Sequence, residues 1–178
     1  MSNLINAKAE EKKLEVLISV DSDVPDGLIG DPLRLGQVLI NLTNNAVKFT
    51  YEGTVIIRVH LIKESRDGIS LRFEVNDSGI GMTQEQQGKL FKAFSQADTS
   101  TSRKFGGTGL GLAISREIIQ HMGGDISTRS EVGQGSCFKV SLPLSVATGV
   151  EQIPSSSLDK KRLLLVDDSE IYADIYHD

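Results

Sequence analysis

The sequence predicts a two-layer α/β sandwich, in which helices cover one face of a mixed β-sheet. Three observations predict this fold class. Segments such as 55–61 alternate apolar and polar residues, which is typical of strands buried on one face. Segment 35–49 repeats its apolar residues at helical spacing, which gives one helix face that can pack on a sheet. Segments 55–61 and 69–75 flank Asp67-Gly68, a pair typical of hairpin turns.

The composition excludes several classes of protein. Hydrophobic residues make up 39% and charged residues 24% of the 178 residues, so neither a wholly disordered chain nor a fibrous repeat fits. A net charge of −5 argues against nucleic-acid binding, which calls for an excess of Lys and Arg. Cys137 is the single cysteine, so no internal disulfide forms and a reducing compartment is expected. We find no secretory signal and no apolar run near the ~18 residues that cross a membrane, and therefore expect a soluble, cytoplasmic protein.

The first part of the chain predicts the end of a helix, a strand and a long helix. Residues 4–13 are polar and resemble the end of a helix. After a turn at 24–27, Asp31 is expected to cap a helix that has Pro32 in its first turn. The alternation that predicts a half-buried strand comprises Leu14, Val16, Ile18 and Val20. The buried stripe of the long helix comprises Leu35, Val38, Leu39, Leu42, Ala46 and Phe49.

The next part predicts the remaining elements of one domain, which we place at 14–146. A glycine turn at 77–82 precedes a short helix, for which Thr83 and Gln86 fit a capping box. Ser95 to Lys104 contains almost no large apolar residue and predicts a mobile loop. A further helix, ended by Gly123-Gly124, is expected to bury Leu110, Ile114 and Ile118. Strands at 126–131 and 136–142 follow.

The end of the sequence predicts a linker and the start of another domain. The apolar pattern lapses at 147–161, where Pro154-Ser155-Ser156-Ser157 is typical of a linker. Leu163 to Val166 is a continuous apolar segment, as in strands buried within a parallel sheet. Asp167 and Asp168 follow it, so we expect residues 162–178 to begin a second domain.

The first of three chemical motifs lies on the long helix. Asn41, Asn45 and Lys48 share one helix face. Two amide oxygens and an ammonium on one face could hold a metal cation and a phosphate, since Mg²⁺ takes few protein oxygens and keeps substrate phosphates. A solvated polar face is the alternative.

The other two motifs are rich in glycine. Asp77 ends a strand, where its carboxylate can accept a hydrogen bond from an exocyclic amine, and Gly79 and Gly81 let backbone approach a ligand closely. An ordinary turn is the alternative. Gly106 to Gly111 leads into a helix, whose exposed N–H groups favour an anion. It matches neither the dinucleotide fingerprint nor the phosphate-binding P-loop, and a flexible hinge is the alternative.

Together, these motifs closely resemble the catalytic, ATP-binding domain of hybrid sensor histidine kinases, of the GHKL superfamily. The resemblance covers about Leu4 to Leu144 and implies a Bergerat-type ATP-binding fold. Leu163 to Tyr172 resembles the first strand of a receiver domain. The matching boxes are the N box at Asp31 to Thr50, the glycine boxes at Asp77 to Met82, Gly107 to Gly111 and Gly133 to Ser136, and the F box at Leu90 to Phe94.

The resemblance implies that the N box binds the metal and the phosphates. Asn45 would be the main Mg²⁺ ligand, with Asn41 beside it. Asn41 and Lys48 would act in catalysis, with Lys48 near the phosphates of ATP.

The resemblance also implies how the base and the triphosphate are held. Asp77 would bind the adenine amino group in a pocket shaped by Gly79 and Gly81, and Ser136 would contact the base through its hydroxyl or a water. The lid that closes over the triphosphate would comprise Gly107, Thr108, Gly109, Leu110 and Gly111, with Phe91 and Phe94 as its anchors.

By the same resemblance, residues 1–13 would end a dimerisation and phosphoacceptor helix, and residues 162–178 would begin a receiver domain. These two domains are the expected partners. The full-length kinase would be a homodimer and could be anchored in the inner membrane. This piece alone would be a monomer. His60, His121 and His177 lack the helical His-Glu/Asp context of a phosphoacceptor.

We therefore expect the chain to bind Mg·ATP and to transfer the γ-phosphoryl group to a histidine on a separate domain. One alternative is an ATP-hydrolysing enzyme of the gyrase, mismatch-repair and heat-shock chaperone type. That type needs an N-box glutamate as general base, and the amide of Asn41 cannot take a proton in this way. The other alternative is a degenerate docking domain, against which the intact motif residues argue.

Overall fold

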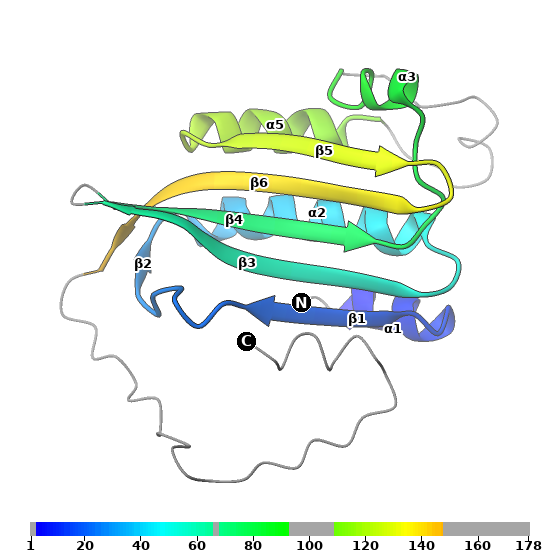
Figure 1. The fold of residues 1–178 in the computed structure, drawn as a ribbon, viewed down its shortest axis with the longest axis horizontal. Helices are drawn as coiled ribbons and strands as arrows, with labels where there is room; N and C mark the ends of the chain where they lie inside the picture. Colours follow the sequence, from blue (N-terminus) through cyan, green and yellow to red (C-terminus); the bar gives the residue numbers. More distant parts are fainter. Residues whose placement is uncertain (1–2, 66–67, 93–108, 148–178) are drawn as a thin grey trace, which may run out of the picture.

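The computed structural model describes residues 3–65, 68–92 and 109–147 (Figure 1). Its helices are α1 (Asn3–Glu11), α2 (Pro32–Phe49), α3 (Gln84–Gln87) and α5 (Gly111–His121). Its strands are β1 (Glu15–Val20), β2 (Leu28–Ile29), β3 (Thr54–Ser65), β4 (Gly68–Asp77), β5 (Asp125–Glu131) and β6 (Gly135–Val146). The predicted loop Ser95 to Lys104, the linker after residue 147 and the strand Leu163 to Val166 lie outside the described residues.

The strands form one mixed sheet in the order β1-β3-β4-β6-β2, and β5 also pairs with β6. β1 is parallel to β3, and the other pairs are antiparallel. Figure 1 shows α2 and α5 behind one face of this sheet, which confirms the predicted two-layer sandwich. The predicted hairpin is β3 with β4.

Helix α2 forms as the sequence predicts and lies beside α5 in the helical layer that covers the sheet. The Asp31 carboxylate accepts the N–H of Arg34 at 3.0 Å, and Pro32 lies in the first turn. The inner side of the helix buries Val38, Leu42, Ala46 and Val47 in the same core as Leu71, Val75, Val140 and Leu142 of β4 and β6. The C-terminal end of α2 is thereby fixed beside the C-terminal end of β4, where the glycine turn begins.

The predicted burial of β1 is wrong in its second half. Ile18 and Val20 are 55% and 56% exposed, whereas Leu17 is only 5% exposed. The reason is the position of the strand: β1 is at the edge of the sheet, and α2 packs mainly over β4 and β3. The sequence pattern indicates which residues share a strand face, but not whether a helix covers it.

The predicted stripe of α5 is also wrong at one residue. Ile114 is 43% exposed, and the buried residues of α5 are Ala113, Ser115 and Ile119. Ser115 lies on the buried side because its hydroxyl accepts a hydrogen bond from α2. The helix ends as predicted, since Gly123 has a positive φ of 78° and the N–H of Gly124 donates to the carbonyl of Ile119.

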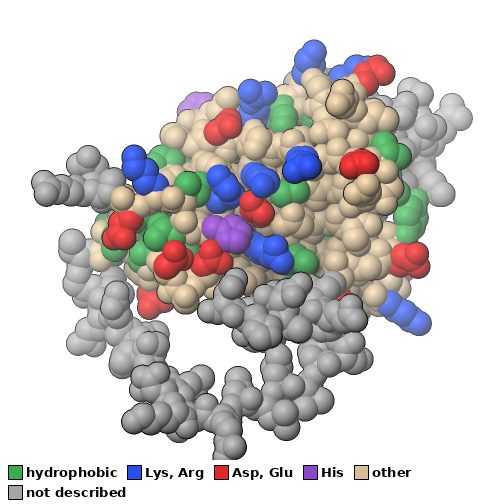
Figure 2. Space-filling view, in the orientation of Figure 1, with side chains coloured by type: hydrophobic (Ala, Val, Ile, Leu, Met, Phe, Trp, Pro, Cys, Tyr) green, Lys and Arg blue, Asp and Glu red, His purple; other side chains and the backbone are tan. Residues whose placement is uncertain are grey.

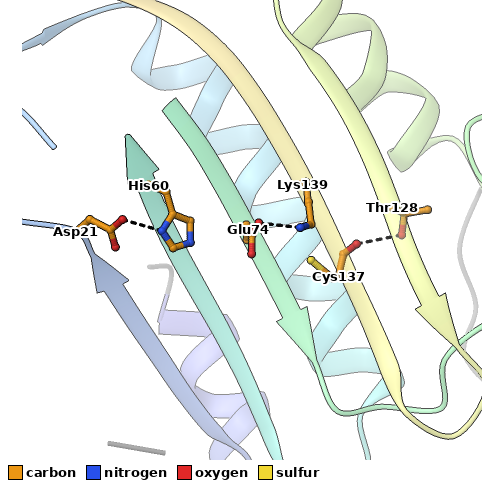
Figure 3. Close-up of polar contacts among 6 residues, drawn as sticks. All are labelled: Asp21, His60, Glu74, Thr128, Cys137 and Lys139. Carbon is orange, nitrogen blue, oxygen red and sulfur yellow. Dashed lines mark hydrogen bonds and ion pairs between the residues drawn. The ribbon is translucent and has the colours of Figure 1, made fainter. Parts of the chain in front are cut away.

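The opposite face of the sheet is covered by a mixture of basic, acidic and neutral side chains (Figure 2). On this face the His60 ring contacts the Asp21 carboxylate at 2.7 Å, and Lys139 pairs with Glu74 at 3.0 Å (Figure 3). His60 therefore has a structural partner on its own domain, as expected for a strand histidine. Burial, followed by the Glu74 charge, raises the pKa of the neighbouring Cys137 thiol, which favours the protonated over the reactive thiolate form.

Candidate functional site

Asp77 is the last residue of β4 and lies between two neighbouring strands. In the sheet it faces Val55 of β3 and Ser136 of β6. Its Oδ1 accepts the N–H of Gly79 at 2.9 Å, and the N–H of Ser136 also donates to the carboxylate. Burial raises the pKa of Asp77, and the two backbone hydrogen bonds oppose this rise. Within the described ranges no cationic side chain forms an ion pair with it, so the carboxylate keeps acceptor capacity for a donor on a ligand.

The turn after Asp77 requires glycine because backbone approaches it from two sides. A Cβ at Gly79 would lie 2.5 Å from the carbonyl oxygen of Phe49 and 2.8 Å from Asp77 Oδ1. Gly81 has a φ of 64°, and a Cβ there would overlap the carbonyl of Glu131. The predicted glycines are thus needed for close packing, and they place the turn between the end of α2 and the end of β5.

Ser136 lies beside Asp77, its register partner on β6. Its hydroxyl is 3.0 Å from the hydroxyl of Ser130, and the Ser130 hydroxyl donates to the carbonyl of Gly135 at 2.8 Å. These contacts join β5 to β6 next to the turn that connects them. Its contact with an adenine base remains a prediction.

The polar face of α2 is divided between two environments. Asn41 Nδ2 donates to Ser115 Oγ at 3.0 Å, and its Oδ1 lies so close to Gly111 that a Cβ there would be 2.7 Å away. Asn45, one turn later, is half-buried, and its side chain forms no hydrogen bond with the described parts of the chain. Asn41 therefore connects α2 to α5, while the Asn45 amide can serve a ligand.

Lys48 follows on the same helix and lies close to α1. Burial lowers its pKa, and the positive charge of Lys8 lowers it further. Its Nζ lies 5.0 Å from the ring centre of Phe49. The predicted contact of Lys48 with phosphate remains a prediction.

The end of the glycine string leads directly into α5. Gly109 has a φ of 69°, a conformation that favours glycine, and Leu110 is the residue before the first turn. Phe91 is half-buried against the core, and the Arg116 guanidinium lies 5.5 Å from its ring centre. The other predicted lid residues, Phe94, Gly107 and Thr108, lie outside the described residues.

Sequence reasoning missed several residues that build this region. Ser115 is buried and holds Asn41, and Ser78 accepts the N–H of Thr54 at 2.9 Å. The ammonium of Lys12, which follows α1, reaches the carbonyl end of α2. No sequence signal distinguished these three residues, because serines are common in helices and turns and lysines are common after helices.

A hollow lies near the N-cap of α2. It has a volume of about 350 Å³ and is lined by Ile29, Gly30, Asp31, Met122, Pro143, Leu144 and Ser145. Since Asp77 and Asn45 are near the opposite end of the helix, we separate this hollow from the candidate site.

None of the helices described is both long and apolar enough to span a bilayer.

Comparison with protein families identifies the class of protein that this fold and site define. A family model described as histidine kinase-, DNA gyrase B-, and HSP90-like ATPase matches residues 30–146, more than half of the chain. The chain belongs to this family.

Several curated relatives are sensor kinases. GacS, a sensor histidine kinase of Pseudomonas protegens, is 45% identical over 164 residues, which are 92% of this chain and 18% of GacS. BarA, a signal transduction histidine-protein kinase of Escherichia coli K12, is 42% identical over 166 residues, again 92% of this chain and 18% of the relative. The chain thus spans less than a fifth of the length of these relatives.

Solved structures agree with the fold. Full-length ShkA in complex with AMPPNP superposes with a TM-score of 0.68 at 35% identity, over 81% of this chain and 28% of ShkA. The catalytic domain of the histidine kinase ThkA gives a TM-score of 0.62 at 30% identity, over 79% of this chain and 85% of that domain. The mixed α/β fold is that of histidine kinase ATP-binding domains.

Proposed function

We propose that this chain is the catalytic domain of a hybrid sensor histidine kinase, which binds Mg·ATP and transfers the γ-phosphoryl group to a histidine on a separate dimerisation domain. The named kinase relatives, and the AMPPNP bound to ShkA, support this proposal. The observation that carries it in this chain is the environment of Asp77. A half-buried carboxylate with a raised pKa, at a glycine turn, is suited to a ligand that supplies hydrogen-bond donors.

The adenine amino group would be that donor. The N–H of the amino group would replace the hydration that the Asp77 carboxylate loses on burial. This hydrogen bond would stabilise the ionised form of the carboxylate. Gly79 and Gly81 would shape the base pocket by letting the turn pack against the carbonyls of Phe49 and Glu131, where a Cβ has no room. Ser136 would contribute its hydroxyl at the same strand end.

The residues of α2 fit a magnesium ion by their chemistry. Mg²⁺ prefers oxygen ligands and retains phosphates and waters, so one or two amide oxygens are sufficient protein ligands. Asn45 would be the main ligand, because its amide is not engaged by the described residues, and Asn41 would lie beside it. When bound, the metal would neutralise charge on the phosphate oxygens.

Phosphoryl transfer would depend mainly on positioning. An imidazole nitrogen of the acceptor forms the new N–P bond, the bond to the bridging oxygen of the β-phosphate breaks, and ADP leaves. Lys48 would stabilise the phosphate charge from the same helix face as Asn45. Gly109, Leu110 and Gly111 would close with the rest of the lid, Gly107 and Thr108, under the anchors Phe91 and Phe94.

Hydrolysis is the competing activity within the same family. A water nucleophile needs a general base, and the first N-box position carries Asn41, whose amide is hydrogen-bonded to Ser115. An amide in this position favours transfer to an imidazole, which is itself a strong nucleophile. Steady-state release of phosphate from ATP would separate the two activities.

The domain organisation follows the same proposal. Residues 1–13, which include α1, would end the dimerisation helix. Residues 147–161 would link the catalytic domain to a receiver that begins at 162–178. The full-length kinase would be a homodimer with its catalytic domain in the cytoplasm, and the dimerisation and receiver domains would be its partners.

The test is transfer of label from γ-labelled ATP. We expect the chain alone to take up no acid-labile phosphate, because His60 and His121 belong to β3 and α5. We expect label on a histidine-bearing helical hairpin of a sensor kinase when this hairpin is added. Label on His60 or His121 of the chain, or rapid hydrolysis without transfer, would contradict the proposal.

A further inference from the structure

Lys12 follows α1 directly and reaches the carbonyl end of α2. Its Nζ donates to the carbonyl oxygens of Val47, Lys48 and Thr50, at 2.8, 3.0 and 2.9 Å. An ammonium has three donors, so all three are used. The last carbonyls of a helix have no partner within the helix and carry the negative end of its dipole. Lys12 supplies both the donors and the positive charge that this helix end requires.

The other carbonyls of the same turn are also satisfied. The carbonyl of Ala46 accepts from the N–H and the hydroxyl of Thr50. The carbonyl of Phe49 accepts the N–H of Ile80 at 3.2 Å. Every carbonyl from Ala46 to Thr50 therefore has a donor, and three of the five depend on one side chain. Without the Lys12 ammonium, the half-buried carbonyls of Val47, Lys48 and Thr50 would need water as their hydrogen-bond donor.

Lys12 is itself fixed to α1. The helix ends in a turn in which the N–H of Leu14 donates to the carbonyl of Ala9 at 2.9 Å, and Lys13 adopts a φ of 56°. Ile5 and Ala9 are buried in the main core, and α1 packs against α2. The side chain of Lys12 also lies over the ring of Tyr51, 5.7 Å from its centre. A displacement of α1 would therefore move the ammonium relative to α2.

The end of α2 in turn contacts the turn that follows Asp77. The Phe49 carbonyl binds Ile80, and the Cα of Gly79 lies so close to this carbonyl that a Cβ would be 2.5 Å from its oxygen. The N–H of Gly79 donates to Asp77 Oδ1. Contiguous contacts thus run from Lys12, through the last turn of α2, to the carboxylate of Asp77.

We propose that Lys12 is a positioning residue, which holds the end of α2 so that the Gly79–Ile80 turn presents Asp77 to the nucleotide base. This assignment rests on the proposed function of the site. It makes the helix α1 and nucleotide binding mutually dependent: a shift of α1 that withdraws the ammonium weakens binding, and bound nucleotide stabilises the connection between α1 and α2.

Three variants of the full chain test this role. Lys12→Met keeps the length and the apolar stem of the side chain but removes the three donors. Lys12→Arg keeps a charged group with several N–H donors. Lys13→Met is the matched control, since it removes a neighbouring lysine whose side chain is exposed. Two quantities are measured: the affinity for AMPPNP with Mg²⁺ and for adenosine, and amide hydrogen exchange at Ile80 and, as a core reference, at Val75.

We expect Lys12→Met to weaken binding of both ligands by about fivefold or more, the lower end of typical coupling between distinct sites. Exchange at Ile80 should accelerate while exchange at Val75 is unchanged, and Lys12→Arg should restore part of both effects. Lys13→Met should match the wild type.

Two results would overturn the assignment: wild-type affinity and exchange in Lys12→Met, or equal acceleration at Ile80 and Val75, which would indicate general destabilisation. If the wild-type chain binds neither ligand, the proposed function fails. Exchange at Ile80 then still decides whether Lys12 orders the turn.

Discussion

Asn41 Nδ2 donates to Ser115 Oγ at 3.0 Å, which joins the middle of α2 to the first turns of α5. Asn41 Oδ1 lies against Gly111, the first residue of α5. The residue that the sequence places beside a magnesium ligand therefore also sets the spacing between two helices. A change at the start of α5 should reach the proposed metal-binding face of α2 without altering the core.

Gly111→Ala should reduce Mg²⁺-dependent nucleotide affinity by about tenfold, because the new Cβ would lie 2.7 Å from Asn41 Oδ1 and displace this amide. Gly36→Ala is the matched control on α2, where nothing lies within 4 Å of the added methyl group. The control should raise the free energy of unfolding by about 0.5–1 kcal/mol and leave affinity unchanged. Denaturant unfolding and nucleotide titration measure both quantities, and unchanged affinity in Gly111→Ala would remove Asn41 from the site.

Asp77→Asn should weaken adenine nucleotide binding and stabilise the ligand-free domain. Loss of a hydrogen bond to a charged acceptor costs about 1.5–3 kcal/mol, or roughly 10- to 100-fold in affinity. The pKa of Asp77 is raised above 3.8 in the folded state, so the folded chain binds more protons than the unfolded chain between these two pKa values. The free energy of unfolding of the wild type therefore falls as the pH rises through this range. Asp77→Asn, which carries no titrating group at this position, avoids that fall.

The same carboxylate predicts how binding depends on pH. Protonation of Asp77 would remove the negative charge that strengthens its proposed hydrogen bond with the adenine amino group, so wild-type affinity should fall as the pH is lowered through its raised pKa. Asp77→Asn should lack this dependence. Parallel pH profiles of nucleotide affinity in the two proteins would assign the effect to another group.

Gly81→Ala should destabilise the fold much more than Gly133→Ala. Both residues have positive φ, 64° and 80°, so both variants lose about 1–2 kcal/mol from backbone strain. A Cβ at Gly81 would also overlap the carbonyl of Glu131, whereas nothing lies within 4 Å at Gly133. The difference between the two unfolding free energies measures the close approach alone, and equal values would show that the turn can shift to admit a side chain.

The sequence predicted the elements whose cause is local. The cap at Asp31, the capping box at Thr83 and the glycine end of α5 were all confirmed, because each depends on residues within one turn. The hairpin and the two-layer architecture were confirmed for the same reason, since alternation and helical spacing are local patterns.

What the sequence could not predict depends on contacts between distant elements. Ile18 alternates correctly, yet it is exposed because β1 is at the sheet edge. Ser115 is buried because it meets Asn41, 74 positions earlier in the chain. Lys12 looked like part of a charged helix end, and only the fold brings it to the carbonyls of α2.

The central claim is that Asp77 and Asn45 together bind Mg-nucleotide, and calorimetric titration tests it most directly. AMPPNP would be titrated into the wild type, Asp77→Asn and Asn45→Ala, with and without Mg²⁺, at two temperatures so that a small enthalpy cannot hide binding. The account predicts that Mg²⁺ enhances binding to the wild type, that Asp77→Asn binds roughly 10- to 100-fold more weakly, and that Asn45→Ala loses the enhancement by Mg²⁺. Equal affinity and equal Mg²⁺ enhancement in all three proteins, or no binding by the wild type, would contradict it.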